Sequence, residues 1–92
     1  PLTMPSIDIA VINKLGLHAR ASAKLTQLAS RFRSEIHIAR GTRRVNAKSI
    51  MGVMMLAAGI GTKVTVDAEG EDAQEALDQI RALFEQKFGE AE

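Results

Sequence analysis

Two hydrophobic periods alternate along this chain, and their order limits the folds that it can adopt. Four segments read as half-buried strands with one apolar face, two long segments carry the apolar stripe of an amphipathic helix, and a third segment reads as a short helix. No internal repeat or low-complexity linker separates these segments. The expected strands cover about residues 6–12, 34–40, 43–47 and 63–67, and the expected helices cover about residues 18–32, 49–56 and 71–88.

The order β-α-β-β-α-β-α predicts an α+β fold, because every strand has one apolar face and every long helix has one apolar stripe. The simplest way to bury these surfaces is a four-stranded, mostly antiparallel sheet with three helices on one face. The pattern alone also admits a ferredoxin-like arrangement of the same elements. Val53 and Leu56 are the expected core residues of the short helix. Glu71 and Asp72 are expected in the first turn of the last helix, where the helix dipole favours acidic residues.

Composition limits the chain further. Its 92 residues suffice for one domain, and a chain of this size buries roughly 60–70% of its unfolded surface. The absence of cysteine excludes a disulfide framework, a thiolate zinc site and a thiol nucleophile. No long apolar run or signal-peptide pattern is present, so we expect a cytoplasmic protein. Met4 is the expected natural start, which makes residues 4–92 a single domain and residues 1–3 a remnant of cloning.

Charge is unevenly distributed, although the formal net charge is only +1. Residues 1–63 carry ten Lys and Arg against two Asp and Glu, whereas residues 64–92 carry two against nine. A basic face can steer acidic partners, either protein or nucleic acid. RNA binding is disfavoured, because base stacking needs exposed aromatic side chains and the three phenylalanines fall on helical core stripes. His37, on the polar face of the second expected strand, is expected to be a solvated surface residue.

A histidine and an arginine stand two residues apart where the first strand gives way to the first helix, in the sequence Leu-Gly-Leu-His18-Ala-Arg20. The first N–H groups of a helix lack intrahelical partners, and the helix dipole is positive there. Such a site favours phosphate and the neutral form of an imidazole, and the forked donors of Arg20 suit phosphate oxygens. The residues alone suggest a histidine that accepts a phosphoryl group, although a histidine at a helix start is more often a capping or surface residue.

Two segments resemble the HPr family, the histidine phosphocarriers of the bacterial phosphoenolpyruvate-dependent sugar phosphotransferase system. Residues 13–22, NKLGLHARAS, resemble the active-site segment of that family, and residues 48–56, KSIMGVMML, resemble its regulatory-serine segment. The spacing between the histidine and the serine also fits. The resemblance extends from about Ile7 to Phe88, and it implies the open-faced β-sandwich of the family.

The resemblance implies that His18 carries the phosphoryl group on Nδ1. Phosphoryl transfer needs in-line positioning and donors for the equatorial oxygens, and the Ala19 and Arg20 amides, with the Arg20 guanidinium, are expected to supply them. Gly16 is expected to permit an unusual φ and the close approach of a partner's backbone. Ala21 departs from the family pattern, which usually has proline there; alanine keeps the helix, so we expect a slightly less rigid loop without loss of function.

Ser49 is expected to cap the short helix by accepting a hydrogen bond from an N–H two or three residues on. The resemblance adds regulatory phosphorylation of Ser49 by HPr kinase/phosphorylase. Ile50, Met51 and Met54 are expected to form an exposed apolar patch, because a helix of two turns cannot bury every apolar side chain that it carries. The resemblance implies that this patch docks Enzyme I and Enzyme IIA, and methionine suits a surface that repacks against several partners.

The sequence therefore predicts a phosphocarrier whose His18 takes a phosphoryl group from phospho-Enzyme I and passes it to a histidine of Enzyme IIA. The carrier would be a stoichiometric intermediate rather than an enzyme, with no metal or cofactor, no nucleic-acid partner and no membrane insertion. A monomer is expected. A nitrogen-branch or purely regulatory phosphocarrier is the main alternative, since that variant shares the NKLG-x-HAR lead-in, and an RNA-binding α/β module is a weaker one. The intact Lys48-Ser49-Ile50 segment favours the HPr type.

Overall fold

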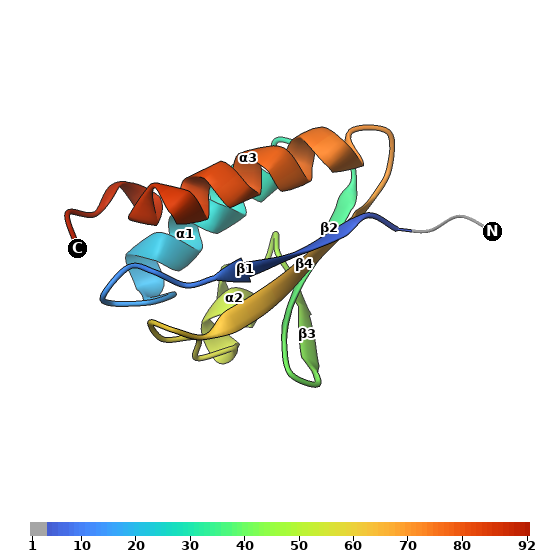
Figure 1. Cartoon of the computed structure of the whole chain (residues 1–92). Helices are drawn as coiled ribbons and strands as arrows, with labels where there is room; N and C mark the ends of the chain where they lie inside the picture. Colours follow the sequence, from blue (N-terminus) through green and yellow to red (C-terminus); the bar gives the residue numbers. More distant parts are fainter. Residues whose placement is uncertain (1–3) are drawn as a thin grey trace.

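The computed structural model describes residues 4–92 and confirms the expected order of strands and helices (Figure 1). The expectation for residues 1–3 lies outside the described residues. The strands are β1 (Ser6–Ala10), β2 (Glu35–Arg40), β3 (Arg43–Asn46) and β4 (Lys63–Glu69). The helices are α1 (Ala19–Ala29), α2 (Ile50–Met55) and α3 (Ala73–Glu85), and the 3₁₀ turn η1 (Lys87–Gly89) follows α3.

The four strands form one sheet in the order β1-β4-β2-β3, and every neighbouring pair is antiparallel. This order places β1 at an edge, so it excludes the ferredoxin-like arrangement, in which the first strand lies inside the sheet. Apolar residues lie opposite each other across the strands, as Ile9 and Val64 do. The polar residues between them form the uncovered face. His37 lies there half-buried, with Nδ1 3.9 Å from a carboxylate oxygen of Asp67, and is less solvated than expected.

The helices cover the apolar face of the sheet and share one core with it. The helices α1 and α3 lie side by side and contact each other, while α2 packs against α1 (Figure 1). Val53 and Leu56 are buried, as expected. Phe84 of α3 packs edge-on against Phe88 of η1, with ring centroids 4.8 Å apart. Burying a side chain of this size contributes about 1.5–3 kcal/mol, so the two rings hold the end of the chain against the core.

The long helices are shorter than their apolar stripes. The helix α1 ends at Ala29 rather than near residue 32, yet Phe32 stays buried. The helix α3 ends at Glu85, and Phe88 reaches the core from η1 with a left-handed φ of +57°. Turns that keep an apolar side chain pointing inward extend the hydrophobic pattern beyond the hydrogen-bonded helix. Among residues 4–92, no helix has the length and apolar character needed to cross a bilayer.

The sequence placed Glu71 and Asp72 in the first turn of the last helix. In the structure both residues precede α3, and Asp72 is its N-cap residue. The Asp72 carboxylate turns away from its own helix and accepts hydrogen bonds from the Arg33 N–H, the Ser34 N–H and the Ser34 hydroxyl, at 2.9, 3.0 and 2.5 Å. The bonds from the Ser34 hydroxyl and the Arg33 N–H hold the pKa of the Asp72 carboxyl below its usual value. Asp72 thus joins the start of α3 to the start of β2.

We expect Asp72→Asn to lower the free energy of unfolding at pH 7, because the three bonds go to two carboxylate oxygens, whereas an amide has one oxygen and must turn its NH₂ group toward a donor. A carboxyl whose folded pKa lies below its unfolded pKa stabilises the fold above the unfolded value, and this contribution is lost as the pH falls through the folded pKa. The free energies of unfolding of wild type and variant should therefore converge as the pH falls below about 4. Urea denaturation at pH 7 and pH 3 measures the difference. Glu71→Gln is the control, and an equal loss in both variants would contradict the assignment.

Candidate functional site

The turn between β1 and α1 places His18 and Arg20 at the start of a helix whose donors are free. His18 is the N-cap residue of α1, with φ −71° and ψ 179°, and its side chain makes no capping bond. The first helical bond runs from the Ser22 N–H to the His18 carbonyl oxygen, at 2.8 Å. The N–H groups of the residues between them, 19–21, find no partner within residues 4–92. This helix start can therefore bind an anion through its backbone.

Gly16 allows this turn to pack closely on the loop that follows α2. Its φ is +65°, and a Cβ at this position would lie 2.5 Å from the Ala58 carbonyl oxygen and 2.8 Å from the Gly59 Cα. The adjacent Leu17 N–H donates to the same Ala58 oxygen, at 2.9 Å. Gly16 is buried, so the backbone that it approaches is that of this chain rather than that of a partner. The glycine thus positions the histidine turn from within.

A glutamate near the C-terminus contacts His18, and no local sequence pattern predicts this contact. Nε2 of His18 and Oε2 of Glu90 lie 2.5 Å apart, although the residues are 72 positions apart in the chain. The other carboxylate oxygen accepts a hydrogen bond from Nδ2 of Asn13, at 3.0 Å. The hydrogen bonds from Asn13 and from His18 hold the pKa of the Glu90 carboxyl below its usual value, so Glu90 is ionised at neutral pH. Nδ1 of His18 has no hydrogen-bond partner among the described residues.

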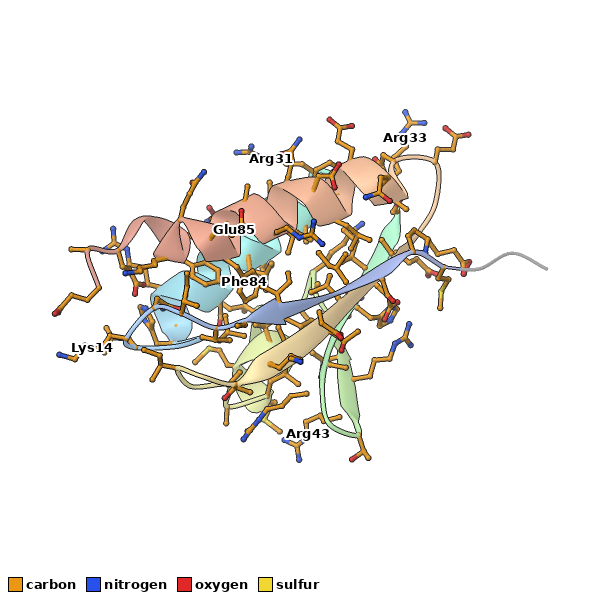
Figure 2. All side chains as sticks on the ribbon, in the orientation of Figure 1. Lys14, Arg31, Arg33, Arg43, Phe84 and Glu85 are labelled. Carbon is orange, nitrogen blue, oxygen red and sulfur yellow. The ribbon has the colours of Figure 1, made fainter. Side chains whose placement is uncertain are left out.

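An open hollow of about 330 Å³ adjoins this contact. Residues of the C-terminal segment line it together with Lys14, whose N–H donates to the backbone oxygen of Glu92 at 2.5 Å. Figure 2 shows Lys14 at the same end of the molecule as the end of the chain. The His18 side chain is 29% exposed, which leaves part of the ring accessible to a partner. The hollow is lined by Lys14, Leu15, His18, Arg20, Glu90, Ala91 and Glu92.

The helix α2 carries the expected serine and the expected apolar patch. Oγ of Ser49 accepts a hydrogen bond from the Gly52 N–H at 3.1 Å, which confirms that Ser49 caps the helix. Ile50, Met51 and Met54 are exposed, and Met51 is 69% exposed. Met55 is exposed as well and belongs to the same short helix, although the sequence interpretation left it out. The helix therefore presents an apolar surface to solvent.

The basic residues of the first 63 positions do not form a single face. Figure 2 shows Arg31 and Arg33 on one side of the molecule and Arg43 on the opposite side. Arg43 donates to a carbonyl oxygen at the end of α2, at 2.7 Å, and Arg44 pairs with Asp67 at 2.8 Å. All three aromatic side chains are buried. These observations weaken the case for a nucleic-acid surface within residues 4–92.

Comparison of the sequence and the structure with known proteins identifies the family of this chain. The family described as "PTS HPr component phosphorylation site" matches residues 5–86. The chain belongs to the HPr family. The phosphocarrier protein HPr of Cupriavidus necator is 62% identical over 85 residues, which cover 92% of this chain and 96% of that protein. The crystal structure of HPr-C-His from Thermoanaerobacter tengcongensis has a TM-score of 0.93 and 45% identity, and the match covers 97% of this chain and 100% of that one.

Membership of the HPr family confirms the open-faced sandwich and the phosphocarrier function that the sequence predicted. One relative carries the name of the nitrogen-branch carrier: the phosphocarrier protein NPr of Shewanella violacea is 48% identical over 84 residues, covering 91% of this chain and 92% of that protein. The HPr of Cupriavidus necator is the more similar of the two.

We expect Gly16→Ala to destabilise the fold more than Gly41→Ala does. Both glycines have a left-handed φ, of +65° and +61°, but a Cβ at Gly41 would meet nothing within 4 Å. Gly41→Ala should therefore lower the free energy of unfolding by about 1–2 kcal/mol through backbone strain alone. Gly16→Ala should cost at least about 1 kcal/mol more, because the new methyl group displaces the loop after α2. Urea denaturation measures both, and equal losses would show that close packing does not require this glycine.

Proposed function

We propose that His18 accepts a phosphoryl group on Nδ1 from phospho-Enzyme I and passes it to a histidine of Enzyme IIA. The observation that supports this proposal best is the arrangement around the ring. Nε2 is bonded to Glu90, Nδ1 has no partner among the described residues, and the N–H groups that begin α1 are free. One ring nitrogen is thus available as a nucleophile beside an anion-binding helix start.

In this transfer the lone pair of Nδ1 forms a bond to phosphorus while the donor's bond to phosphorus breaks and its electron pair stays on the donor. The protein contributes positioning and charge stabilisation rather than covalent chemistry. The N–H groups of Ala19 and Arg20 are suited to the equatorial oxygens. The Arg20 guanidinium, which lines the same hollow as His18, can add charge-assisted bonds to them. Because the group must leave again, these donors should bind it only moderately.

Two partners must reach His18 in turn, which requires an open site and a shared docking surface. The ring is partly exposed at the edge of an open hollow. We propose that Ile50, Met51 and Met54 on α2 dock both Enzyme I and Enzyme IIA, since these side chains are exposed and apolar. Fully burying an exposed side chain of this size contributes about 1.5–3 kcal/mol, and these three residues, which are 39–69% exposed, would each contribute less.

Ser49 is the proposed regulatory site, phosphorylated by HPr kinase/phosphorylase. Its side chain is exposed, and its hydroxyl oxygen already accepts the Gly52 N–H at the start of α2. A phosphate at a helix start gains from the helix dipole, so the fold should accept it. The same phosphate adds negative charge beside the proposed docking patch.

The carrier itself is proposed to be a single domain over residues 4–92 that acts as a monomer in the cytoplasm. It is a stoichiometric intermediate that returns to its starting state after each transfer. The similarity to the NPr of Shewanella violacea supports a nitrogen-branch carrier as the second candidate. Transfer rates to a sugar-specific and to a nitrogen-branch Enzyme IIA distinguish the two.

Incubation with phosphoenolpyruvate and Enzyme I should add one phosphate to this chain, stable in base and labile in acid, as a phosphoramidate is. We expect His18→Ala to abolish the addition and to leave the fold intact, because the ring is part of an open site rather than of the core. Intact mass and a thermal melt measure both effects. His37→Ala, which removes the other histidine, is the control and should accept phosphate normally. Phosphate on His18→Ala would rule out the assignment.

Ser49→Asp should keep or raise stability, by about 0.3–1 kcal/mol at best, because it adds a negative charge at the start of α2. The Michaelis constant for Enzyme I should rise, since the charge must be desolvated in the interface. Met51→Glu should weaken docking in the same way without touching the cap. Gln74→Glu, at the start of α3, is the control and should leave transfer unchanged. Thermal melts and phosphotransfer rates separate the effects; wild-type rates in both α2 variants would show that the patch does not dock Enzyme I.

A further inference from the structure

The carboxylate of Glu90 is held from two sides, and each of its oxygens faces one nitrogen. Oε2 lies 2.5 Å from Nε2 of His18, and Oε1 accepts a hydrogen bond of 3.0 Å from Nδ2 of Asn13. The Glu90 side chain is only 16% exposed, so water competes little for these oxygens. The contact is therefore a defined part of the site.

Asn13 is fully buried, and its surroundings determine how its amide is oriented. Nδ2 uses both of its hydrogens, one toward the Gly16 carbonyl oxygen at 2.8 Å and one toward Glu90. A reversed amide would set Oδ1 against two acceptor oxygens. Oδ1 has no partner among the described residues, and a buried unpaired acceptor is costly, yet this orientation keeps both donors in use. Asn13 therefore presents a donor to Glu90, and only a donor.

The C-terminal segment brings Glu90 to this position along a defined path. Phe88 is buried, and its carbonyl oxygen accepts a hydrogen bond from Nζ of Lys24 at 2.5 Å. Lys87 and Phe88 have φ values of +55° and +57°, which residues other than glycine adopt only where the surroundings enforce them. The Glu90 N–H then donates to the Lys87 carbonyl oxygen at 2.9 Å. The backbone thus fixes where the Cα of Glu90 lies, and the bonds to His18 and Asn13 place its carboxylate.

We propose that Glu90, oriented by Asn13, is a positioning residue that holds the proton of the neutral His18 ring on Nε2 and leaves the lone pair of Nδ1 free to attack phosphorus. An ionised carboxylate accepts hydrogen bonds and donates none, so the nitrogen that faces it carries the hydrogen. In a neutral imidazole the other nitrogen is then unprotonated. This inference rests on the proposed function, because it names the nitrogen that reacts.

The same contact acts after the transfer. When the Nδ1–P bond forms and the donor's bond to phosphorus breaks, the proton stays on Nε2 and the ring becomes cationic. The Glu90 carboxylate lies against that charge. The other charged groups lining the hollow are Lys14, Arg20 and Glu92, and none of them bonds the His18 ring in the described structure. Glu90 is therefore the group that selects between the two ring nitrogens.

Glu90→Gln tests the proposal sharply, because Asn13 offers only a donor. The amide oxygen of the variant should pair with Asn13, so its NH₂ group should face Nε2 and drive the ring proton to Nδ1. Nitrogen-15 NMR of the ring, at alkaline pH where an ordinary imidazole is neutral, reads the tautomer directly. We expect Nε2–H in the wild type and mainly Nδ1–H in the variant. Phosphorylation by phospho-Enzyme I should slow at least about tenfold, since the wrong tautomer predominates.

Glu85→Gln is the matched control, because it neutralises a carboxylate at the end of α3 that neither lines the hollow nor bonds His18. It should keep the wild-type tautomer and rate. Glu90→Ala removes both acceptors and should relax the tautomer toward that of free histidine, with a smaller loss of rate than Glu90→Gln. The proposal is overturned if Glu90→Gln keeps the wild-type tautomer, or changes it without slowing transfer. If wild-type His18 takes no phosphate, the proposed function fails, while the spectrum still shows whether Glu90 sets the tautomer.

Discussion

The hydrogen bond from the Leu17 N–H to the Ala58 carbonyl oxygen is the contact on which the functional surface depends. It ties the turn that carries His18 to the loop that follows α2, and Gly16 beside it lets the two backbones meet with no side chain between them. The start of α1, which can bind an anion, and the apolar surface of α2 are thereby held in a fixed position relative to each other. A partner that docks on α2, as we propose, would meet the histidine in a set position.

A six-residue helix such as α2 is not stable alone, because few of its backbone groups can bond within it. The rest of the fold supplies the missing partners. Ser49 bonds an N–H at its start, while Arg40 and Arg43 of the β2–β3 hairpin donate to carbonyl oxygens at its end. The hairpin thus stabilises the helix that displays the apolar patch. A segment rich in basic residues therefore need not form a basic binding face, because some of its arginines donate hydrogen bonds to the carbonyl oxygens at the end of α2.

Local features of the site could be predicted from sequence, and distant contacts could not. The positions of His18 before a helical stripe and of Ser49 before a short helix could be predicted, because neighbouring residues in the chain determine where a helix starts. The contact between Glu90 and His18 has no such signature, since periodicity does not say where a segment after the last helix will fold. Asp72 shows the same limit. Its place before a helix suggested a favourable charge in the first turn, whereas its bonds go to Ser34 and the Arg33 backbone.

Besides the buried Phe88 ring and the Glu90 side chain, backbone contacts hold the C-terminal segment, through the backbone oxygens of Phe88 and Glu92 and the N–H of Glu90. Contacts of this kind do not depend on which side chains follow, but they depend strictly on how many residues there are. One inserted or deleted residue shifts an extended chain by about 3.3–3.8 Å, which is enough to carry a carboxylate out of reach of an imidazole. Across evolution we therefore expect the number of residues between Phe88 and Glu90 to be inherited unchanged, while position 91 drifts freely.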